Sequence, residues 1–267
     1  MNQFLEAKNL FKDDFDLEGY LDSFSFEHAK TELLRSLNSP DIPLIFLLGN
    51  PGYGKSYLLK FIEQRADAIK IAKFISLPYF TEREFLENLV EIAGVQAINK
   101  RYDLEVLMKT LKDRLNPLEY TIIIDEAQLL NHKQMELIRI LSDMRIFKFL
   151  LAMHKKDGHK ILAKSHFKSR TNSVIYMEAL KKEEIERYIT NRLLSRNLSN
   201  IVSAFDSSDI NFIYKISQGN FRLMKKLLSA LFEIIDVAQQ ENLKKYSKIR
   251  EATLTMAAID IGLINVK

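Results

Sequence analysis

The sequence predicts an α/β protein in which a mostly parallel, five-stranded sheet is followed by an all-helical region. Three observations support this prediction. Short apolar runs alternate with amphipathic helical segments up to about residue 178, a pattern typical of a parallel sheet covered by helices on both faces. From Leu180 onward every periodic segment has the spacing of a helix. A glycine-rich turn also joins the first apolar run to the helical segment that follows it.

The individual elements follow from apolar periodicity and from residues that start and stop helices. The five strands are expected at 43–49, 69–77, 120–124, 147–152 and 173–177. Helices are expected at 26–37, from Lys55 onward, at 81–94, 103–115 and 133–144, within 158–169, and at 182–196, 207–216, 221–238 and 247–264. We therefore divide the chain into an α/β core with an N-terminal extension, residues 1–178, and a helical lid, residues 179–267.

The first apolar run leads into a phosphate-binding pattern of the form G-x-x-x-x-G-K-[ST]. Its residues are Gly49, Asn50, Pro51, Gly52, Tyr53, Gly54, Lys55 and Ser56, with Tyr57 next. Glycines let successive backbone N–H groups converge on one phosphate, and the following helix adds the positive end of its dipole. We assign Gly49 to Tyr57 to nucleotide binding, with Lys55 on the β- and γ-phosphates and Ser56 on Mg²⁺. The alternative is a chance glycine-rich turn, which the flanking strand and helix disfavour.

Two adjacent carboxylates directly follow the third predicted strand. The apolar run at 122–124 is followed by Asp125 and Glu126, so both carboxylates are expected at the C-terminal edge of the sheet, where ligands bind in open α/β folds. Asp125 would then bind Mg²⁺ through water, and Glu126 would position and deprotonate an attacking water. The alternative for either residue alone is a solvated acidic turn. A glutamate directly after the aspartate favours hydrolysis over phosphoryl transfer to a small molecule.

Three further residues are candidates, each with a simpler alternative. Arg170, just before the fifth strand, is placed to reach the γ-phosphate of a neighbouring subunit, although both it and its rival Lys168 also suit a solvated surface. His154, just past the fourth strand, is placed to sense the γ-phosphate or to orient water, but a lone histidine there is usually only a satisfied polar residue. Arg222 follows a glycine turn at 217–220 and would bring positive charge over bound phosphates, unless it is a solvated helix arginine.

Composition limits the other classes of protein to be considered. The chain has 267 residues, a net charge of +4 and no cysteine, so disulfides and thiolate metal sites are excluded and a reducing cytoplasm is favoured. No apolar run reaches the length of a membrane span, and the first residues lack a signal-peptide pattern. The basic cluster Lys244, Lys245, Lys248 and Arg250 fits DNA or an acidic protein surface, although a solvated helical face is the commoner explanation.

These motifs, in this order, resemble an AAA+ ATPase. More narrowly they resemble the family of ExeA-type ATPases of type II secretion and of ATPases of mannose-sensitive pilus biogenesis. The stretches that carry the resemblance are 24–37, 124–130 (IDEAQLL), 136–141, 179–193, 217–227 and 256–260, so it covers the chain from about residue 10 to residue 262. The Asp-Glu-Ala-Gln block also occurs in transposition ATPases that load on DNA.

The sequence departs from this family at two points. Residues 153–157 read Met-His-Lys-Lys-Asp where the family usually has a Gly-Gln-Pro-Glu-Leu turn, so His154 stands at a position that is glutamine in relatives. ExeA-type proteins also carry a transmembrane segment and a peptidoglycan-binding domain, neither of which this sequence contains. We therefore expect the short, soluble form of the family.

The resemblance implies Mg²⁺-dependent hydrolysis of ATP in a ring or partial ring, with Arg170 completing a neighbour's site and Arg222 linking ATP to the lid. We expect a cytoplasmic homo-oligomer that acts through a protein partner in a secretion, type IV pilus or DNA-uptake apparatus at the inner membrane. One alternative is a DNA-binding ATPase of the transposition or replication-loading type. Another is a nucleotide-dependent scaffold that binds ATP and barely hydrolyses it.

Overall fold

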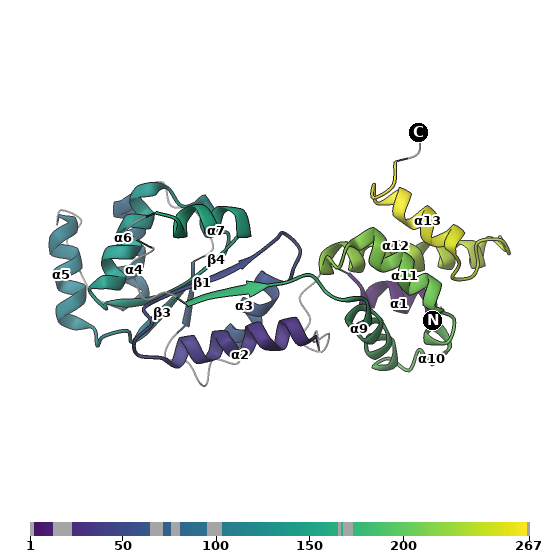
Figure 1. Cartoon of the computed structure of the whole chain (residues 1–267), viewed down its shortest axis with the longest axis horizontal. Coiled ribbons are helices and arrows are strands. Elements are labelled where there is room, and N and C mark those ends of the chain that lie inside the picture. The colour runs from purple at the N-terminus through teal and green to yellow at the C-terminus, as the bar shows by residue number, and fades with distance from the viewer. Residues whose placement is uncertain are drawn as a thin grey trace. The chain divides into compact units, whose positions relative to one another are not determined.

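The computed structural model describes residues 3–12, 23–64, 72–75, 81–94, 103–164, 167 and 173–265. The chain divides into two compact units, which we describe separately (Figure 1). The α/β unit comprises His28–Pro51 and Lys55–Met177, and the helical unit comprises Met1–Glu27, Gly52–Gly54 and Glu178–Lys267. The long C-terminal part of the helical unit therefore begins where the sequence changes to helical periodicity throughout.

The α/β unit is built on a five-stranded parallel sheet, as the sequence predicts. Its strands are β1 (Leu44–Gly49), β2 (Ala72–Ile75), β3 (Tyr120–Ile124), β4 (Phe147–Met153) and β5 (Ser173–Met177), in the order β2-β3-β4-β1-β5. Every neighbouring pair is parallel. Strand β4 therefore separates the two strands that carry the motifs, β1 and β3. Strand β2, which lies between those two in the sequence, is at an edge of the sheet.

The register of the sheet brings the ends of three strands to one edge. Leu48 of β1 lies opposite Met153 of β4, and Leu151 of β4 lies opposite Ile124 of β3. Because the three strands run in the same direction, the residues that directly follow them share the C-terminal edge of the sheet. These residues are Asn50, Asp125 and His154.

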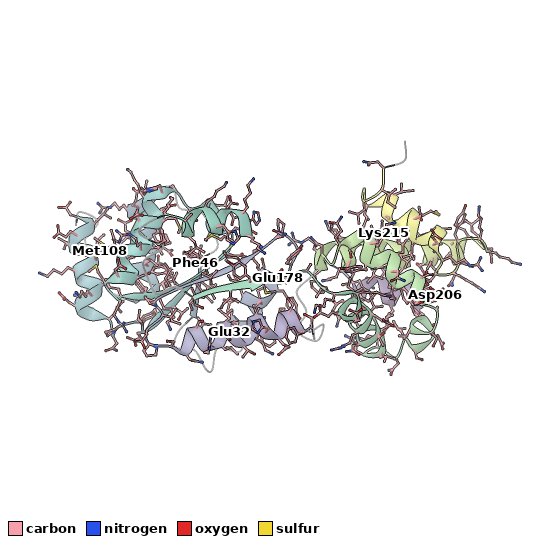
Figure 2. All side chains as sticks on the ribbon, viewed as in Figure 1. Glu32, Phe46, Met108, Glu178, Asp206 and Lys215 are labelled. Carbon is pink, nitrogen blue, oxygen red and sulfur yellow. The ribbon has the colours of Figure 1, made fainter. Side chains whose placement is uncertain are left out.

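One face of the sheet is covered by α4 (Glu82–Ile92), α5 (Leu104–Arg114) and α6 (His132–Asp143). Alternate strand residues, Phe46 and Leu48 among them, join the buried residues of these helices in one hydrophobic core. Phe46, labelled within the α/β unit in Figure 2, is fully buried. Helix α4 begins where the sequence predicts, because Thr81 and Glu84 form a capping box that satisfies two of its orphan N–H groups.

The opposite face carries α2 (Phe24–Asn38) and α3 (Lys55–Gln64) (Figure 1). The buried Lys148 of β4 reaches the end of α2, where its Nζ donates to the carbonyl oxygens of Ser36, Leu37 and Ser39 at 3.2, 2.5 and 2.6 Å. Carbonyls in the last turn of a helix lack helical partners, so the ammonium group caps α2. Burial, assisted by the like charge of Arg145, lowers the pKa of Lys148 to about 8.

The helical unit contains α1 (Gln3–Leu10), α9 (Lys182–Leu194), α10 (Ser199–Val202), α11 (Ser207–Ser217), α12 (Phe221–Gln240) and α13 (Glu251–Asp260). The sequence places the N-terminal extension with the α/β core, and for α1 this is wrong. Lys8 forms a 2.8 Å ion pair with Glu233 of α12, and Arg192 of α9 donates from Nε to the Leu10 carbonyl at 3.3 Å. A helix of eight residues with two buried side chains is placed by such distant contacts, which sequence periodicity does not reveal.

Several shorter elements differ from the prediction. Helix α7 (Lys155–Leu162) begins before the predicted segment 158–169. Helix α13 is shorter than 247–264 at both ends, because residues 247–250 and 261–264 form bends, turns and irregular backbone. Helix α10 and the 3₁₀ turn Ala127–Leu129 are not predicted, since elements of three or four residues show no periodicity. The predicted strand residues 69–71 and 76–77 lie outside the described residues. In the part of the chain that the structure describes, no helix is long and apolar enough to cross a membrane.

Candidate active site

Lys55 is the first residue of α3, directly behind the glycine-rich loop, and it is buried. Its Nζ donates to the carbonyl oxygens of Gly49 at 2.9 Å and Asn50 at 3.3 Å. A buried ammonium is costly unless it is hydrogen-bonded, and the loop itself supplies these partners. The loop therefore holds a positive charge beside the N-terminus of α3, an arrangement that suits a phosphate group.

Glycine is needed in this loop for two different reasons. At position 49 the reason is space: a Cβ would lie 2.8 Å from the Cβ and 3.1 Å from the carbonyl oxygen of Met177 in β5. At positions 52 and 54 the reason is the backbone, because φ is +79° and +92°, in the region that side chains disfavour. The glycines that define the sequence motif are thus accounted for by local geometry.

Gly52–Gly54 belong to the helical unit, together with the start of α12. The backbone N–H of Arg222 donates to the Gly52 carbonyl at 3.2 Å. A Cβ on Gly52 would lie 2.2 Å from Oδ1 of Asn220, which caps α12 by accepting from the Leu223 N–H at 3.1 Å. Sequence reasoning misses this contact of Asn220, although an asparagine just before a helix is a recognisable cap.

Asp125 and Glu126 directly follow the buried strand β3, as predicted. Asp125 Oδ1 accepts a hydrogen bond from the Glu126 N–H at 2.9 Å, which fixes that carboxylate against the strand end. Glu126 has a left-handed backbone, with φ 50° and ψ 37°, and its side chain is 47% exposed. A non-glycine residue rarely adopts this conformation, and such strain is concentrated at functional sites. The turn presents the Glu126 carboxylate to solvent at the sheet edge.

Two further polar side chains meet at Glu126. Gln128 Nε2 donates to Glu126 Oε2, and Gln128 Oε1 accepts from the backbone N–H of His154 at 3.4 Å. The His154 ring lies close to the same carboxylate, with Nε2 3.5 Å from Glu126 Oε2, and its Nδ1 lies 3.8 Å from Asp157 Oδ2. The structure thus joins His154 to the predicted general base. Gln128 belongs to the Asp-Glu-Ala-Gln block, but the sequence assigns it no role, because the contact it makes with His154 spans 26 positions.

The other predicted site residues are placed as follows. Asn50 and Pro51 are exposed, whereas Tyr53, Ser56 and Tyr57 are half-buried. The side chain of Arg222 is exposed in the helical unit, and its contact with phosphate stays a prediction. Arg170 and its rival Lys168 lie outside the described residues, so their roles stay predictions as well.

The Ser56 hydroxyl and the Asp125 carboxylate could bind Mg²⁺ as part of a ligand set completed by water and phosphate. Among the described residues no group of three or more His, Cys, Asp or Glu side chains could hold a metal ion. Mg²⁺ does not need such a group, because it keeps several waters and takes one or two protein oxygens together with substrate phosphates. The hydroxyl of Ser56 and the carboxylate of Asp125 are both half-buried rather than enclosed, which fits that requirement.

Residues 42–162 match the protein-family model described as "AAA domain". The matched segment runs from just before β1 to the end of α7, so it contains the glycine-rich loop, the carboxylate pair and His154. None of the curated proteins compared with the sequence matches it significantly. The match to this family model, with the glycine-rich loop inside it, supports an ATP-hydrolysing enzyme.

Several solved structures share the fold of this chain. RuvB of Thermotoga maritima, a Holliday junction branch migration motor, has a TM-score of 0.59 at 17% identity over 93% of this chain and 72% of its own. The ORC1 protein of Aeropyrum pernix in complex with DNA has a TM-score of 0.61 at 15% identity over 96% and 69%. Drosophila ORC bound to DNA has a TM-score of 0.65 at 12% identity over 97% and 66%. The narrower resemblance to ExeA-type and pilus-biogenesis ATPases stays a prediction.

Proposed function

We propose that the protein is a Mg²⁺-dependent ATPase. The observation that supports this most directly is the position of two motifs at one edge of the AAA-domain sheet: the loop that ends in buried Lys55, and the pair Asp125 and Glu126. Cationic and N–H groups on one side would neutralise phosphate charge, and carboxylates on the other would serve a metal ion and a water molecule.

Hydrolysis would proceed by in-line attack of a water oxygen on the γ-phosphorus. As that bond forms, the bond from the γ-phosphorus to the oxygen bridging the β- and γ-phosphates breaks, and its electron pair leaves with ADP. Glu126 takes the proton from the attacking water and later releases it to solvent. Lys55 stabilises the negative charge that develops on the departing β-phosphate.

Other predicted residues complete this scheme. Ser56 and Asp125 would hold the Mg²⁺ ion, which when bound supplies positive charge to the phosphates. We propose that Arg170 acts on the γ-phosphate of a neighbouring copy in a homo-oligomer, and that Arg222 contacts phosphates from the helical unit. The cytoplasmic location is part of the same proposal.

A second observation favours DNA as the partner of this ATPase. The turns between α12 and α13 carry the basic turn, which we define as Lys244, Lys245, Lys248 and Arg250, and all four residues are exposed. Backbone hydrogen bonds order the segment, with the Leu243 N–H donating to the Ala238 carbonyl at 2.7 Å. An ordered group of cations suits the regularly spaced charges of a phosphate backbone. The similar structures of RuvB and of DNA-bound ORC are consistent with this role.

The alternative role follows from the family resemblance at 124–130 and 179–193. In that case the ATPase would assist a secretion, pilus or DNA-uptake apparatus through a protein partner. ATP turnover by the purified protein, measured with and without double-stranded DNA at several protein concentrations, separates the two roles.

Turnover that rises on addition of DNA, and loses this response when Lys244, Lys245 and Lys248 are replaced by glutamate, would support the DNA role. Turnover that rises with protein concentration and ignores DNA would support self-assembly with a protein partner. Binding of ATP without turnover under any condition would contradict the ATPase and favour a scaffold. Lys55→Ala gives the background rate of ATP turnover, because this variant lacks the phosphate contact that both roles require.

A further inference from the structure

Gln128 joins the predicted general base to the end of a neighbouring strand. Its side-chain Nε2 donates to Glu126 Oε2, and its Oε1 accepts from the backbone N–H of His154, the first residue after β4. All three residues belong to the α/β unit. The neutral amide of Gln128 therefore both donates and accepts a hydrogen bond at this edge of the sheet.

The orientation of this amide is set by the chemistry of its two partners. A carboxylate only accepts hydrogen bonds and a backbone N–H only donates. Turning the amide over would place the Gln128 oxygen against the Glu126 carboxylate and its NH₂ group against the His154 N–H. Both contacts would then be repulsive, so the observed orientation is the one the site allows. A glutamate at this position would set two carboxylates together, and an asparagine would be one methylene shorter.

Burial and backbone hydrogen bonds hold the residues on either side of this amide. Ala127 is fully buried and anchors the turn, in which the Leu129 N–H donates to the Glu126 carbonyl at 2.9 Å. On the other side, the Gly158 N–H donates to the His154 carbonyl at 2.9 Å and so fixes the start of α7.

Helix α7 in turn lies directly on the strand of the phosphate loop. A Cβ on Gly158 would come within 2.3 Å of Leu48 Cδ2. Packed contacts therefore connect β1, α7 and the end of β4 to the amide that holds Glu126.

We propose that Gln128 is a positioning residue for ATP hydrolysis that acts through Glu126. This inference rests on the ATPase function proposed above. By holding Oε2, Gln128 restrains the Glu126 carboxylate and leaves Oε1 to accept a proton from the attacking water. Restraint of a catalytic group raises the rate by reducing the number of unproductive orientations. Gln128 has no part in binding the nucleotide in this account, so its effect falls on kcat alone.

The test is the steady-state kinetics of Gln128→Ala and Gln128→Glu. We expect Gln128→Ala to lower kcat by roughly tenfold, the effect of one lost orienting hydrogen bond, while KM for ATP and the melting temperature stay unchanged. Gln128→Glu should lower kcat further, because the new carboxylate repels Glu126. A merely structural residue would change the melting temperature and would not separate kcat from KM.

The matched control is Gln240→Ala. Gln240 Nε2 donates to Asp236 Oδ2 at 2.9 Å on α12, so this variant loses the same kind of amide–carboxylate contact away from the site. We expect it to have wild-type kcat. A double-mutant cycle adds a second criterion: in a Glu126→Gln background, measured by single turnover, Gln128→Ala should cause no further loss.

Wild-type or higher turnover by Gln128→Ala would overturn the inference and leave the ATPase intact. So would a full tenfold further loss in the Glu126→Gln background, because Gln128 would then act independently of Glu126. If the wild-type protein hydrolyses no ATP under any condition, the proposed function fails and this inference fails with it. The two failures are distinguished by the wild-type rate.

Discussion

Position 52 requires glycine for two reasons, its backbone conformation and the lack of space for a side chain. Its φ is +79°, and a Cβ would lie 2.2 Å from Asn220 Oδ1. Asn220 has little freedom to move away, because the same oxygen caps α12 through the Leu223 N–H. Substitution at this position would therefore strain the phosphate loop and disturb the helix cap together.

Gly52→Ala should lower the affinity for ATP by about tenfold or more, since a left-handed conformation costs a side chain roughly 1–2 kcal/mol before the clash is counted. Nucleotide affinity can be measured by titration with a fluorescent ATP analogue. Gly94→Ala is the matched control, because φ of Gly94 is +64° but a Cβ at that position would meet nothing within 4 Å. That variant should lose about 1 kcal/mol of unfolding free energy and keep wild-type affinity. Equal affinities for the two variants would contradict this account.

The residues of the site differ in how far the sequence could predict them. Lys55, Asp125 and Glu126 are found because each motif lies on one continuous stretch next to a recognisable strand. Gln128 and Asn220 are not found as site residues, since their contacts with His154 and Gly52 join parts of the chain that are distant in sequence. A local sequence motif indicates which chemical groups are present. The supporting contacts of Gln128 and Asn220 depend instead on how distant parts of the chain are brought together in the fold.

At the scale of the elements, a buried lysine side chain joins β4 to α2. Lys148 is buried on β4 and its ammonium group satisfies the last carbonyls of α2. Hydrogen bonds to carbonyls favour the charged form, but burial opposes it more strongly, so the pKa falls from 10.5 to about 8. The charge that caps the helix is thus held at a cost in desolvation.

This lowered pKa predicts a pH dependence of stability. Between about pH 8 and pH 10.5 the unfolded chain keeps the Lys148 proton and the folded chain loses it, so the contribution of Lys148 to stability rises with pH. The expected slope is up to about 1.4 kcal/mol per pH unit. Urea unfolding at pH 7.5, 9 and 10 should show wild type gaining stability relative to Lys148→Met as pH rises. For Lys109→Met, at an exposed position, the free energy of unfolding should change with pH in the same way as that of wild type. If Lys148→Met also followed the wild-type pH dependence, the lowered pKa of Lys148 would be refuted.

Elements with strong periodicity or clear caps are the ones that the sequence locates well. Strands β3 and β5 have the predicted bounds, and α4 and α5 agree with prediction to within two residues at each end. Helix α13 is shorter than predicted because apolar spacing continues through a segment that forms hydrogen-bonded turns. Helix α1 is missed because its stability comes from contacts with α9 and α12.

At the scale of the molecule, the order of the strands determines which site residues meet. Because β4 lies between β1 and β3, its end brings His154 next to the carboxylate that follows β3. The sequence predicts five parallel strands but not their order, which depends on long-range pairing. The membership of Gly52–Gly54 in the helical unit is likewise invisible in a motif that reads as one continuous loop.

The measurement that tests the central claim most directly is ATP hydrolysis by wild type and by Glu126→Gln, with ATP binding measured on the same samples. If Glu126 is the general base, the variant should hydrolyse ATP at least about a hundredfold more slowly and still bind it with wild-type affinity. Hydrolysis by Glu126→Gln at the wild-type rate would contradict the assignment of the base, and with it the account of Gln128.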